Sequence, residues 1–274
     1  MERPVIGFLT DFGLDGAAAI CRGVMLSIAR DAQIVDISHA VRKYAISDGA
    51  YLLAAAVPWL PVGVHVAVVD PGVGTERRPI GIRTARGDVL IGPDNGLLVP
   101  AAERLGGIAE SRLLANRAWM LPVTSQTFHG RDLFAPMAAQ LAIGGAFEDL
   151  GPAVEPRDLV RLPAATATVE EGRLVTAATY VDSFGNVRLA GGPADLAAAL
   201  GDLPWGTRLG LELLDDPATR DDHARWHQTF GDATAGELLV YVDSNGNLAL
   251  AVSSGDAASR LRIGTGARIG IARA

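Results

Sequence analysis

Cysteine is almost absent from this sequence: among 274 residues there is one, Cys21. A single cysteine excludes an internal disulfide and any metal site built from several cysteines. Long apolar runs are also missing, because none reaches the ~18 residues that a membrane-spanning helix requires. Basic residues number 24 against 31 acidic ones and form no stripe that would attract nucleic acid. The composition therefore predicts a globular protein that binds neither membranes nor nucleic acid.

Two common nucleotide-binding motifs are absent as well. The chain has no GxGxxG after a strand and no phosphate loop ending in GKS or GKT, which argues against dinucleotides and nucleoside triphosphates as ligands. The opening residues, MERPVIGFLTDFG, place Asp11 inside an apolar run and contain no cleavage-site pattern. They predict a first strand in place of a secretion signal, and hence a cytoplasmic protein.

The first half of the chain alternates between short apolar runs and segments of helical composition. The runs predicted to be strands are 5–9, 34–37, 65–69, 81–84 and 89–92. The segments predicted to be helices are 16–30, 47–57, 100–105 and 133–141. This alternation predicts an α/β fold with a mostly parallel sheet flanked by helices on both faces.

The composition changes to Pro, Ala and Thr over 152–167, which predicts a boundary between two domains, 1–163 and 164–274. Short β-rich runs follow the boundary, at 174–181, 187–189, 208–214, 238–242, 248–252 and 267–271. The second, smaller domain is therefore predicted to be an antiparallel β-barrel-like fold or a sandwich.

Three predicted strands lead into an aspartate that lies within two residues of Gly or Pro: Asp11, Asp70 and Asp94. Ligands gather at the carboxyl ends of parallel strands, so these acids predict a polar pocket at one edge of the sheet. The segment DPGVGTERR also delivers Arg77 close to Asp70. The alternative is that Asp70 only caps a turn and that the arginines are solvated.

Histidines offer two further candidate sites. His129 lies in TFHGRD, just before a predicted helix whose N-terminus would disfavour the imidazolium form and leave the ring able to accept a proton. A single histidine in a loop is, however, more often an ordinary hydrogen-bonding residue. His223 and His227 have the i, i+4 spacing of a metal pair if 221–228 is helical, but no Glu follows His223 as in HExxH and no third ligand is evident. A solvated polar face is the favoured interpretation there, and no metal site is predicted.

Two nearly identical segments, YVDSFGN at 180–186 and YVDSNGN at 241–247, have the pattern of β-hairpin turns. Gly and Asn reach positive φ at little cost, so a purely structural role would explain both turns.

Five motifs together resemble one enzyme family. They are LTDFG at 9–13, DPGVGTERR at 70–78, PDNG at 93–96, TFHGRD at 127–132 and DSFGN at 182–186. Their order and spacing resemble the adenosine-forming S-adenosyl-L-methionine (SAM) hydrolases, also called SAM hydroxide adenosyltransferases, which are related to the bacterial fluorinase and chlorinase. The resemblance implies an α/β N-terminal domain, a β-barrel-like C-terminal domain, and homotrimers that bind substrate between the N-terminal domain of one subunit and the C-terminal domain of its neighbour.

The resemblance also assigns residues. The catalytic set of the hydrolases falls on Asp70, Arg77 and His129. The halogenating relatives carry a tyrosine in place of Asp70 and a residue other than histidine in place of His129, which favours water over halide. The segment 82–90 likewise lacks the long loop of the fluorinase. The positions that match substrate-binding residues are Asp11 for the ribose, Tyr44 for an aromatic wall, Asp182 and Ser244 for the methionine ammonium and carboxylate, and Phe184, Asn186 and Phe230 for adenine. Val252 stands where relatives have an arginine, so backbone at 253–254, including Ser254, is expected to bind the adenine edge.

The expected activity is hydrolysis of SAM to adenosine and L-methionine by attack of water on ribose C5′. Asp70 and His129 are expected to orient the water and accept its proton, while Arg77 stabilises the developing hydroxide and fixes Asp70. The leaving group is a neutral thioether, so no metal or redox cofactor is expected and SAM is the substrate. The alternatives are a chloride-dependent halogenase and a non-catalytic SAM or adenosine sensor.

Overall fold

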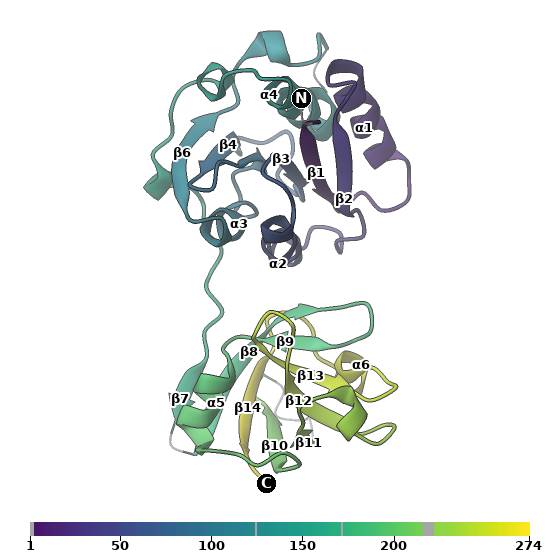
Figure 1. Cartoon of the computed structure of the whole chain (residues 1–274), viewed down its shortest axis with the longest axis vertical. Coiled ribbons are helices and arrows are strands. Elements are labelled where there is room, and N and C mark those ends of the chain that lie inside the picture. The colour runs from purple at the N-terminus through teal and green to yellow at the C-terminus, as the bar shows by residue number, and fades with distance from the viewer. Residues whose placement is uncertain (1–2, 124, 171, 216–221) are drawn as a thin grey trace. The chain divides into compact units, whose positions relative to one another are not determined.

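A computed structural model describes residues 3–123, 125–170, 172–215 and 222–274. The chain divides into two compact units, Met1–Leu162 and Pro163–Ala274, coloured purple to teal and green to yellow in Figure 1. The boundary predicted from the sequence lies between residues 163 and 164, one residue after the observed one. The predicted fold class, an α/β unit followed by a smaller β-barrel-like unit, is confirmed.

The N-terminal unit is built on a six-stranded sheet with the order β2-β1-β3-β5-β4-β6. Its strands are β1 (Val5–Thr10), β2 (Gln33–Ser38), β3 (Val64–Val68), β4 (Pro79–Thr84), β5 (Val89–Pro93) and β6 (Ile108–Leu113). The first four strands of this order are parallel, whereas β4 runs antiparallel to both β5 and β6. Only a short turn connects β4 to β5, and a connection of this length joins antiparallel neighbours.

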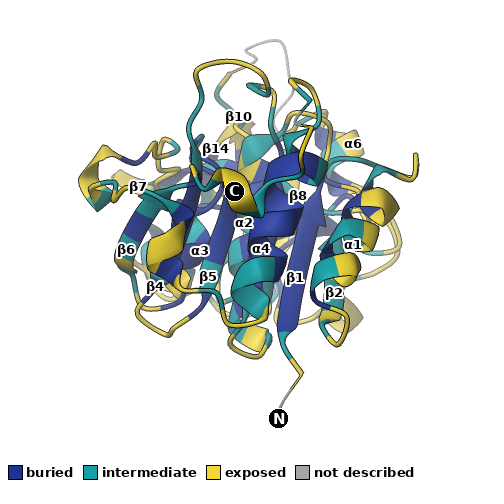
Figure 2. Cartoon of the chain, turned by 90° about the horizontal axis from the view of Figure 1, so that it is seen from above, coloured by how far each residue is buried: buried dark blue, intermediate teal, exposed yellow. Residues whose placement is uncertain are grey.

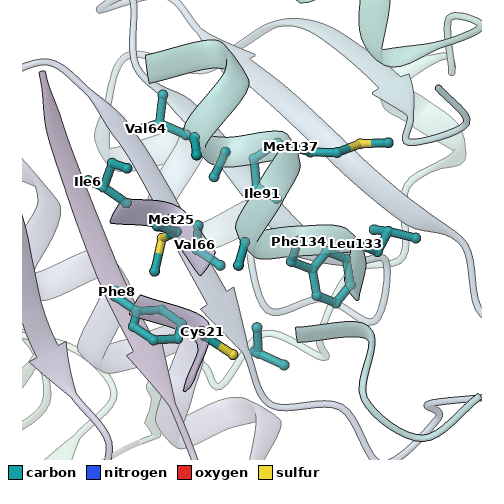
Figure 3. Close-up of a cluster of buried hydrophobic side chains, with 14 of the residues drawn as sticks. Ile6, Phe8, Cys21, Met25, Val64, Val66, Ile91, Leu133, Phe134 and Met137 are labelled. Carbon is teal, nitrogen blue, oxygen red and sulfur yellow. The ribbon is translucent and has the colours of Figure 1, made fainter. Parts of the chain in front are cut away.

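Helices cover both faces of this sheet. Helices α1 (Ala17–Ile28) and α4 (Ala135–Ala142) pack on one face, and α2 (Ile46–Ala56) and α3 (Val99–Arg104) pack on the other. Because both faces are covered, all six residues of β1 are buried, which Figure 2 shows in dark blue. Side chains from β1, β3, α1 and α4 meet in the core drawn in Figure 3, among them Phe8, Val66, Met25 and Met137. Burial of each large side chain contributes ~1.5–3 kcal/mol, so the strands that precede Asp11 and Asp70 are firmly held.

The C-terminal unit is a closed barrel. Its strands are β7 (Thr168–Glu170), β8 (Arg173–Val181), β9 (Val187–Leu189), β10 (Arg208–Leu213), β11 (Asp222–Trp226), β12 (Leu238–Val242), β13 (Leu248–Val252) and β14 (Arg268–Arg273), with the helices α5 (Pro193–Leu200) and α6 (Ala257–Leu261). The order is β14-β10-β11-β12-β13-β9-β8-β7, and pairing of β14 with β8 closes a ring of seven strands. None of the helices in the described parts of the chain is long and apolar enough to cross a lipid bilayer.

The residues around the two candidate metal-binding histidines form a strand, β11, which ends just before His227. On a strand, residues four apart are separated by ~13 Å, so His223 and His227 do not present a shared metal site. His227 is instead buried against Glu237, with its Nε2 3.4 Å from Oε1. Within the described ranges, no group of three or more His, Cys, Asp or Glu side chains is arranged to hold a metal ion.

Candidate active site

A small pocket lies where β1 and β3 end in the N-terminal unit. Its volume is about 90 Å³, enough for a few water molecules. The residues that line it come from the segments after β1, after β3 and before α4: Asp11, Phe12, Tyr44, Val68, Asp70, Val73, Thr127, Phe128, His129 and Gly130. Four of the sequence-predicted site residues therefore share one pocket wall, namely Asp11, Tyr44, Asp70 and His129. Of the three strand-end acids, Asp94 is not among the lining residues; it is buried, pairs with Arg78 and accepts from the backbone N–H of Val160.

Asp70 and Arg77 form a nearly buried ion pair at this pocket. Arg77 Nε donates to Asp70 Oδ1 at 3.1 Å, and Arg77 Nη2 donates to Oδ2. The side chains are only 5% and 7% exposed, respectively, so water screens the pair weakly. The guanidinium also lies 5.4 Å from the ring centre of Phe134. A bidentate pair of this kind fixes the orientation of the carboxylate toward the pocket.

His129 contacts the same guanidinium through Nδ1, which lies 3.1 Å from Arg77 Nη2. An arginine can only donate, so Nδ1 must be the accepting nitrogen and the proton of the neutral ring is on Nε2. Burial lowers the pKa of His129 below its ordinary value, and the positive charge of Arg77 lowers it further, against the opposing effect of Asp70. The ring is therefore neutral at pH 7, as the sequence predicts, although burial is the main cause.

The backbone around His129 is unusual. His129 precedes a five-residue π-helical turn, Gly130–Phe134, that continues into α4. Such turns are rare and occur frequently at functional sites. The loop that carries Arg77 approaches this segment closely at Gly74, where φ is 78° and an added Cβ would lie 2.6 Å from the carbonyl oxygen of Gln126. Gly74 thus allows the loop of Asp70 and Arg77 to contact the segment that leads to His129.

Asp11 and Tyr44 are linked directly. Asp11 Oδ2 accepts a hydrogen bond from the backbone N–H of Tyr44 at 2.9 Å. Tyr44 has a left-handed backbone, with φ of 68°, and its side chain is 70% exposed. The Asp11 carboxylate therefore stabilises a strained residue, and Asp11 also lines the pocket.

A hydrogen-bonded chain that the sequence analysis missed holds the segment next to Asp11. Thr10 Oγ1 lies 2.9 Å from His39 Nδ1, and His39 Nε2 lies 3.0 Å from Asp36 Oδ1. Arg22 donates to the other oxygen of Asp36 at 2.6 Å. The only signal in the sequence was the position of His39 directly after β2, which is weak by itself.

The C-terminal unit has a larger cavity of about 900 Å³. It is lined by every site residue that the sequence predicted in this half of the chain: Asp182, Phe184, Asn186, Phe230, Ser244 and Ser254. Val252 lies in the same wall, together with residues that were not selected from the sequence, among them Arg188, Tyr241 and Asp243. The rings of Phe230 and Tyr241 are 5.0 Å apart, and Phe184 is 77% exposed, so aromatic surface faces the cavity.

The two similar hairpin turns have similar internal bonds. Asp182 Oδ1 accepts from the backbone N–H of Phe184 and of Asn186, at 2.9 and 3.0 Å. Asp243 Oδ1 accepts from the residues at the same offsets, Asn245 and Asn247, at 2.8 and 2.9 Å. Both aspartates therefore stabilise their turns, the structural role that the sequence left open, and both also line the cavity.

Comparison with known proteins identifies the family. Residues 6–151 match the SAM hydroxide adenosyltransferase N-terminal domain, and residues 176–270 match the SAM hydroxide adenosyltransferase C-terminal domain. The chain belongs to the SAM hydroxide adenosyltransferase family. The resemblance proposed from the five sequence motifs is thereby confirmed.

Relatives of this SAM hydroxide adenosyltransferase family member cover nearly its whole length. A protein from Salinispora tropica named (R)-S-adenosyl-L-methionine hydrolase is 46% identical over 267 residues, which cover 97% of each chain. A fluorinase from Actinopolyspora mzabensis is 28% identical and covers 99% of this chain and 98% of its own. A crystal structure of a conserved protein from Thermotoga maritima is 34% identical, has a TM-score of 0.88, and covers 98% of this chain and 100% of its own. Identity to the hydrolase is thus well above identity to the fluorinase.

Proposed function

We propose that the protein hydrolyses SAM to adenosine and L-methionine. The observation that carries the proposal is the contact of Asp70, Arg77 and His129 at one small pocket that Asp11 also lines. The family membership and the 46% identity to a protein named as a SAM hydrolase support the same reaction.

The reaction needs a positioned water molecule. The water oxygen attacks C5′ of the ribose, the C5′–S bond breaks, and its electron pair goes to the sulfonium sulfur, which leaves as the neutral thioether of methionine. Because this leaving group is neutral, the reaction as proposed needs no general acid, metal or redox cofactor. The enzyme accelerates it by holding water and C5′ in line and by removing the proton of the attacking water.

In this arrangement Asp70 is the proton acceptor. His129 Nδ1 already accepts from Arg77 and Nε2 carries a proton, so the neutral ring offers the water a donor and no basic nitrogen. Each oxygen of Asp70 accepts one hydrogen bond from Arg77 and keeps a further lone pair for the water. Arg77 stabilises the carboxylate and the partial negative charge on the attacking oxygen.

Water is favoured over chloride as the nucleophile. The Asp70 carboxylate attracts a hydrogen of water and repels an anion placed at the same point. A sensor that only binds SAM would have no use for a buried Asp70–Arg77 pair in contact with a neutral histidine. Both alternatives therefore fit the pocket less well than hydrolysis.

The substrate is proposed to use both cavities. Asp11 binds the ribose diol and Tyr44 forms an aromatic wall in the N-terminal unit, while Asp182 and Ser244 bind the amino-acid group in the C-terminal unit. Phe184, Asn186, Phe230 and the backbone at Ser254 bind adenine. The family resemblance adds the proposal that the N-terminal unit of one subunit and the C-terminal unit of its neighbour in a homotrimer complete each site. The homotrimer and the cytoplasmic location stay predictions.

The decisive experiment incubates the purified protein with SAM in ¹⁸O-labelled water, with and without chloride, and identifies products by mass spectrometry. We expect adenosine with one ¹⁸O at C5′ and an equal amount of L-methionine. Accumulation of 5′-chloro-5′-deoxyadenosine would identify a halogenase. Binding of SAM without any product would identify a sensor.

A further inference from the structure

The cavity of the C-terminal unit contains an ion pair that the roles above do not use. Arg188, on β9, donates through Nη1 to Oδ2 of Asp243, which follows β12. The two residues are brought together by the sheet, because β9 pairs with β13 and Arg188 lies opposite Ala249. Both residues line the cavity.

Both oxygens of the carboxylate of this pair accept hydrogen bonds from the protein. Oδ1 of Asp243 accepts from the backbone N–H groups of Asn245 and Asn247, and Oδ2 accepts from Arg188. The Asp243 side chain is 2% exposed, whereas that of Arg188 is 18% exposed. Asp243 therefore acts inside the wall, and the guanidinium is the member of the pair that a ligand in the cavity can reach.

The charges on the cavity wall suit an amino acid. Among the residues that line it, three are charged: Asp182, Arg188 and Asp243. Asp182 accepts hydrogen bonds at Oδ1 from the backbone of Phe184 and Asn186 and at Oδ2 from the Asn186 side-chain amide, but it makes no ion pair among the described residues, so its negative charge can attract an ammonium group. Asp243 is neutralised by Arg188, which is the single cation of the wall. The wall thus carries a carboxylate at Asp182 that makes no ion pair among the described residues, and a guanidinium at Arg188 whose Nη1 donates to Asp243. Hydrogen bonds from this guanidinium to a carboxylate, together with attraction of an ammonium group by Asp182, would complement an amino acid.

We propose that Arg188 binds the carboxylate of the methionine group of SAM and makes the enzyme specific for substrates that carry it. This inference rests on the proposed function and assigns a residue that the sequence motifs do not. A guanidinium has five N–H donors in one plane, so it can bind Asp243 and a second carboxylate together. Asp243 is a positioning residue that holds the guanidinium next to Ser244, its neighbour in the chain.

The test compares SAM with its decarboxylated analogue, which keeps the sulfonium and ammonium groups and lacks the carboxylate. The variants are Arg188→Lys, which keeps the charge without the planar fork, and Arg188→Met combined with Asp243→Asn, which avoids a buried unpaired carboxylate. The control is Arg173→Met, which removes an arginine that pairs with Glu170 and Glu212 and is not among the residues lining the cavity. Steady-state kinetics gives kcat/KM for each protein with each substrate.

We expect the wild-type protein and Arg173→Met to prefer SAM over the analogue by about 10- to 100-fold, the usual value of a hydrogen-bonded charge pair. In the double variant, kcat/KM should fall by that factor with SAM and stay within about threefold with the analogue, so that the preference disappears. Arg188→Lys should lose part of the preference. An equal loss with both substrates would mean that the pair is only structural and would overturn the proposal, as would an unchanged preference.

A binding measurement separates this inference from the reaction. If the wild-type protein leaves SAM intact, the proposed function fails, and titration calorimetry then decides the role of Arg188. The probes are L-methionine and 3-(methylthio)propylamine, its decarboxylated form. Tighter binding of methionine that the double variant abolishes would support the proposal. Equal affinity for the two probes would overturn it.

Discussion

Substitutions of His129 test the tautomer that the Arg77 contact imposes. His129→Ala removes both ring nitrogens, His129→Asn keeps an acceptor near Nδ1 for Arg77, and His129→Gln keeps a donor near Nε2. The ring supplies hydrogen bonds to a charged group and to water, each worth ~1.5–3 kcal/mol at most. We therefore expect His129→Ala to lower kcat about 10- to 100-fold. The Asn and Gln variants should each recover part of this loss, and the KM for SAM should change little.

Asp70→Asn should have a larger effect, because it removes the proposed proton acceptor. A general base contributes about 10²- to 10⁴-fold, and the neutral amide also weakens the hold on Arg77. The Asp70→Asn, His129→Ala double variant should be little slower than Asp70→Asn alone, since both groups act on one water molecule. The assay is adenosine formation in single turnovers, separated by liquid chromatography.

The pH dependence gives an independent check. Burial and the charge of Arg77 lower the pKa of His129, so kcat should be level near neutral pH and fall only at a pH below the ordinary histidine value of ~6.5. The activity should fall because protonation of His129 places a proton on Nδ1, which would then face the Nη2–H of Arg77 and could no longer accept its hydrogen bond. His129→Asn should lack this acid limb. The tautomer assignment would be refuted if His129→Ala lost as much activity as Asp70→Asn while the acid limb of the wild-type protein lay above pH 6.5.

Three further predictions concern binding and stability. Asp11→Asn should raise the KM for SAM about 10- to 100-fold with little change in kcat, because the ribose contact persists through the reaction; an unchanged KM would contradict the ribose role. Gly74→Ala should lower both the activity and the midpoint temperature of thermal unfolding, because the added Cβ would clash with the backbone of Gln126. The control is Gly144→Ala, where φ is also positive, at 98°, but no atom lies within 4 Å of the added Cβ. This variant should lose only ~1–2 kcal/mol of folding stability and none of its activity. Asp88→Asn should destabilise the protein at pH 7 by ~3–5 kcal/mol in urea unfolding, because it breaks a buried network with His65 and Arg86. Burial opposes ionisation of Asp88, but hydrogen bonds from His65 and Arg86 outweigh this effect and lower the pKa of Asp88 in the folded protein. The wild-type advantage should therefore be complete above the unfolded-state pKa of ~3.9 and decline progressively as pH falls from there toward the lower folded-state pKa. A pH-independent difference would count against the network.

Apolar periodicity predicted the centre of the N-terminal unit well. The runs around β1, β3 and β5 are buried on both faces, so their sequences are almost continuously apolar and their ends are clear. Strand β6 was missed because it lies at the sheet edge and carries charges, Glu110 and Arg112, that pair with each other. The antiparallel direction of β4 was missed although Gly87, with φ of 103°, marked the tight turn before β5.

Strand β11 could not be predicted from local sequence. Its residues, DHARW, are mostly polar and have no strong preference for a strand. They are extended because β10 and β12 pair with them on either side and because Ala224 and Trp226 point into the barrel core. Pairing with neighbouring strands therefore determines that this segment is a strand. For the same reason His223 and His227 do not lie together on one face of a helix.

The candidate site, like the fold, could be predicted only in part from local sequence. Residue types and strand ends predicted which side chains gather, but the bonds between them depend on contacts across long stretches of chain, such as Arg77 with His129. The two hairpin turns make the point most directly, because their sequences and internal hydrogen bonds are nearly the same. Register alone places Arg188 next to the second aspartate and leaves the first without an ion pair among the described residues. One motif therefore yields an anionic group at Asp182 and a neutralised one at Asp243, a difference on which recognition of a zwitterionic amino acid would depend.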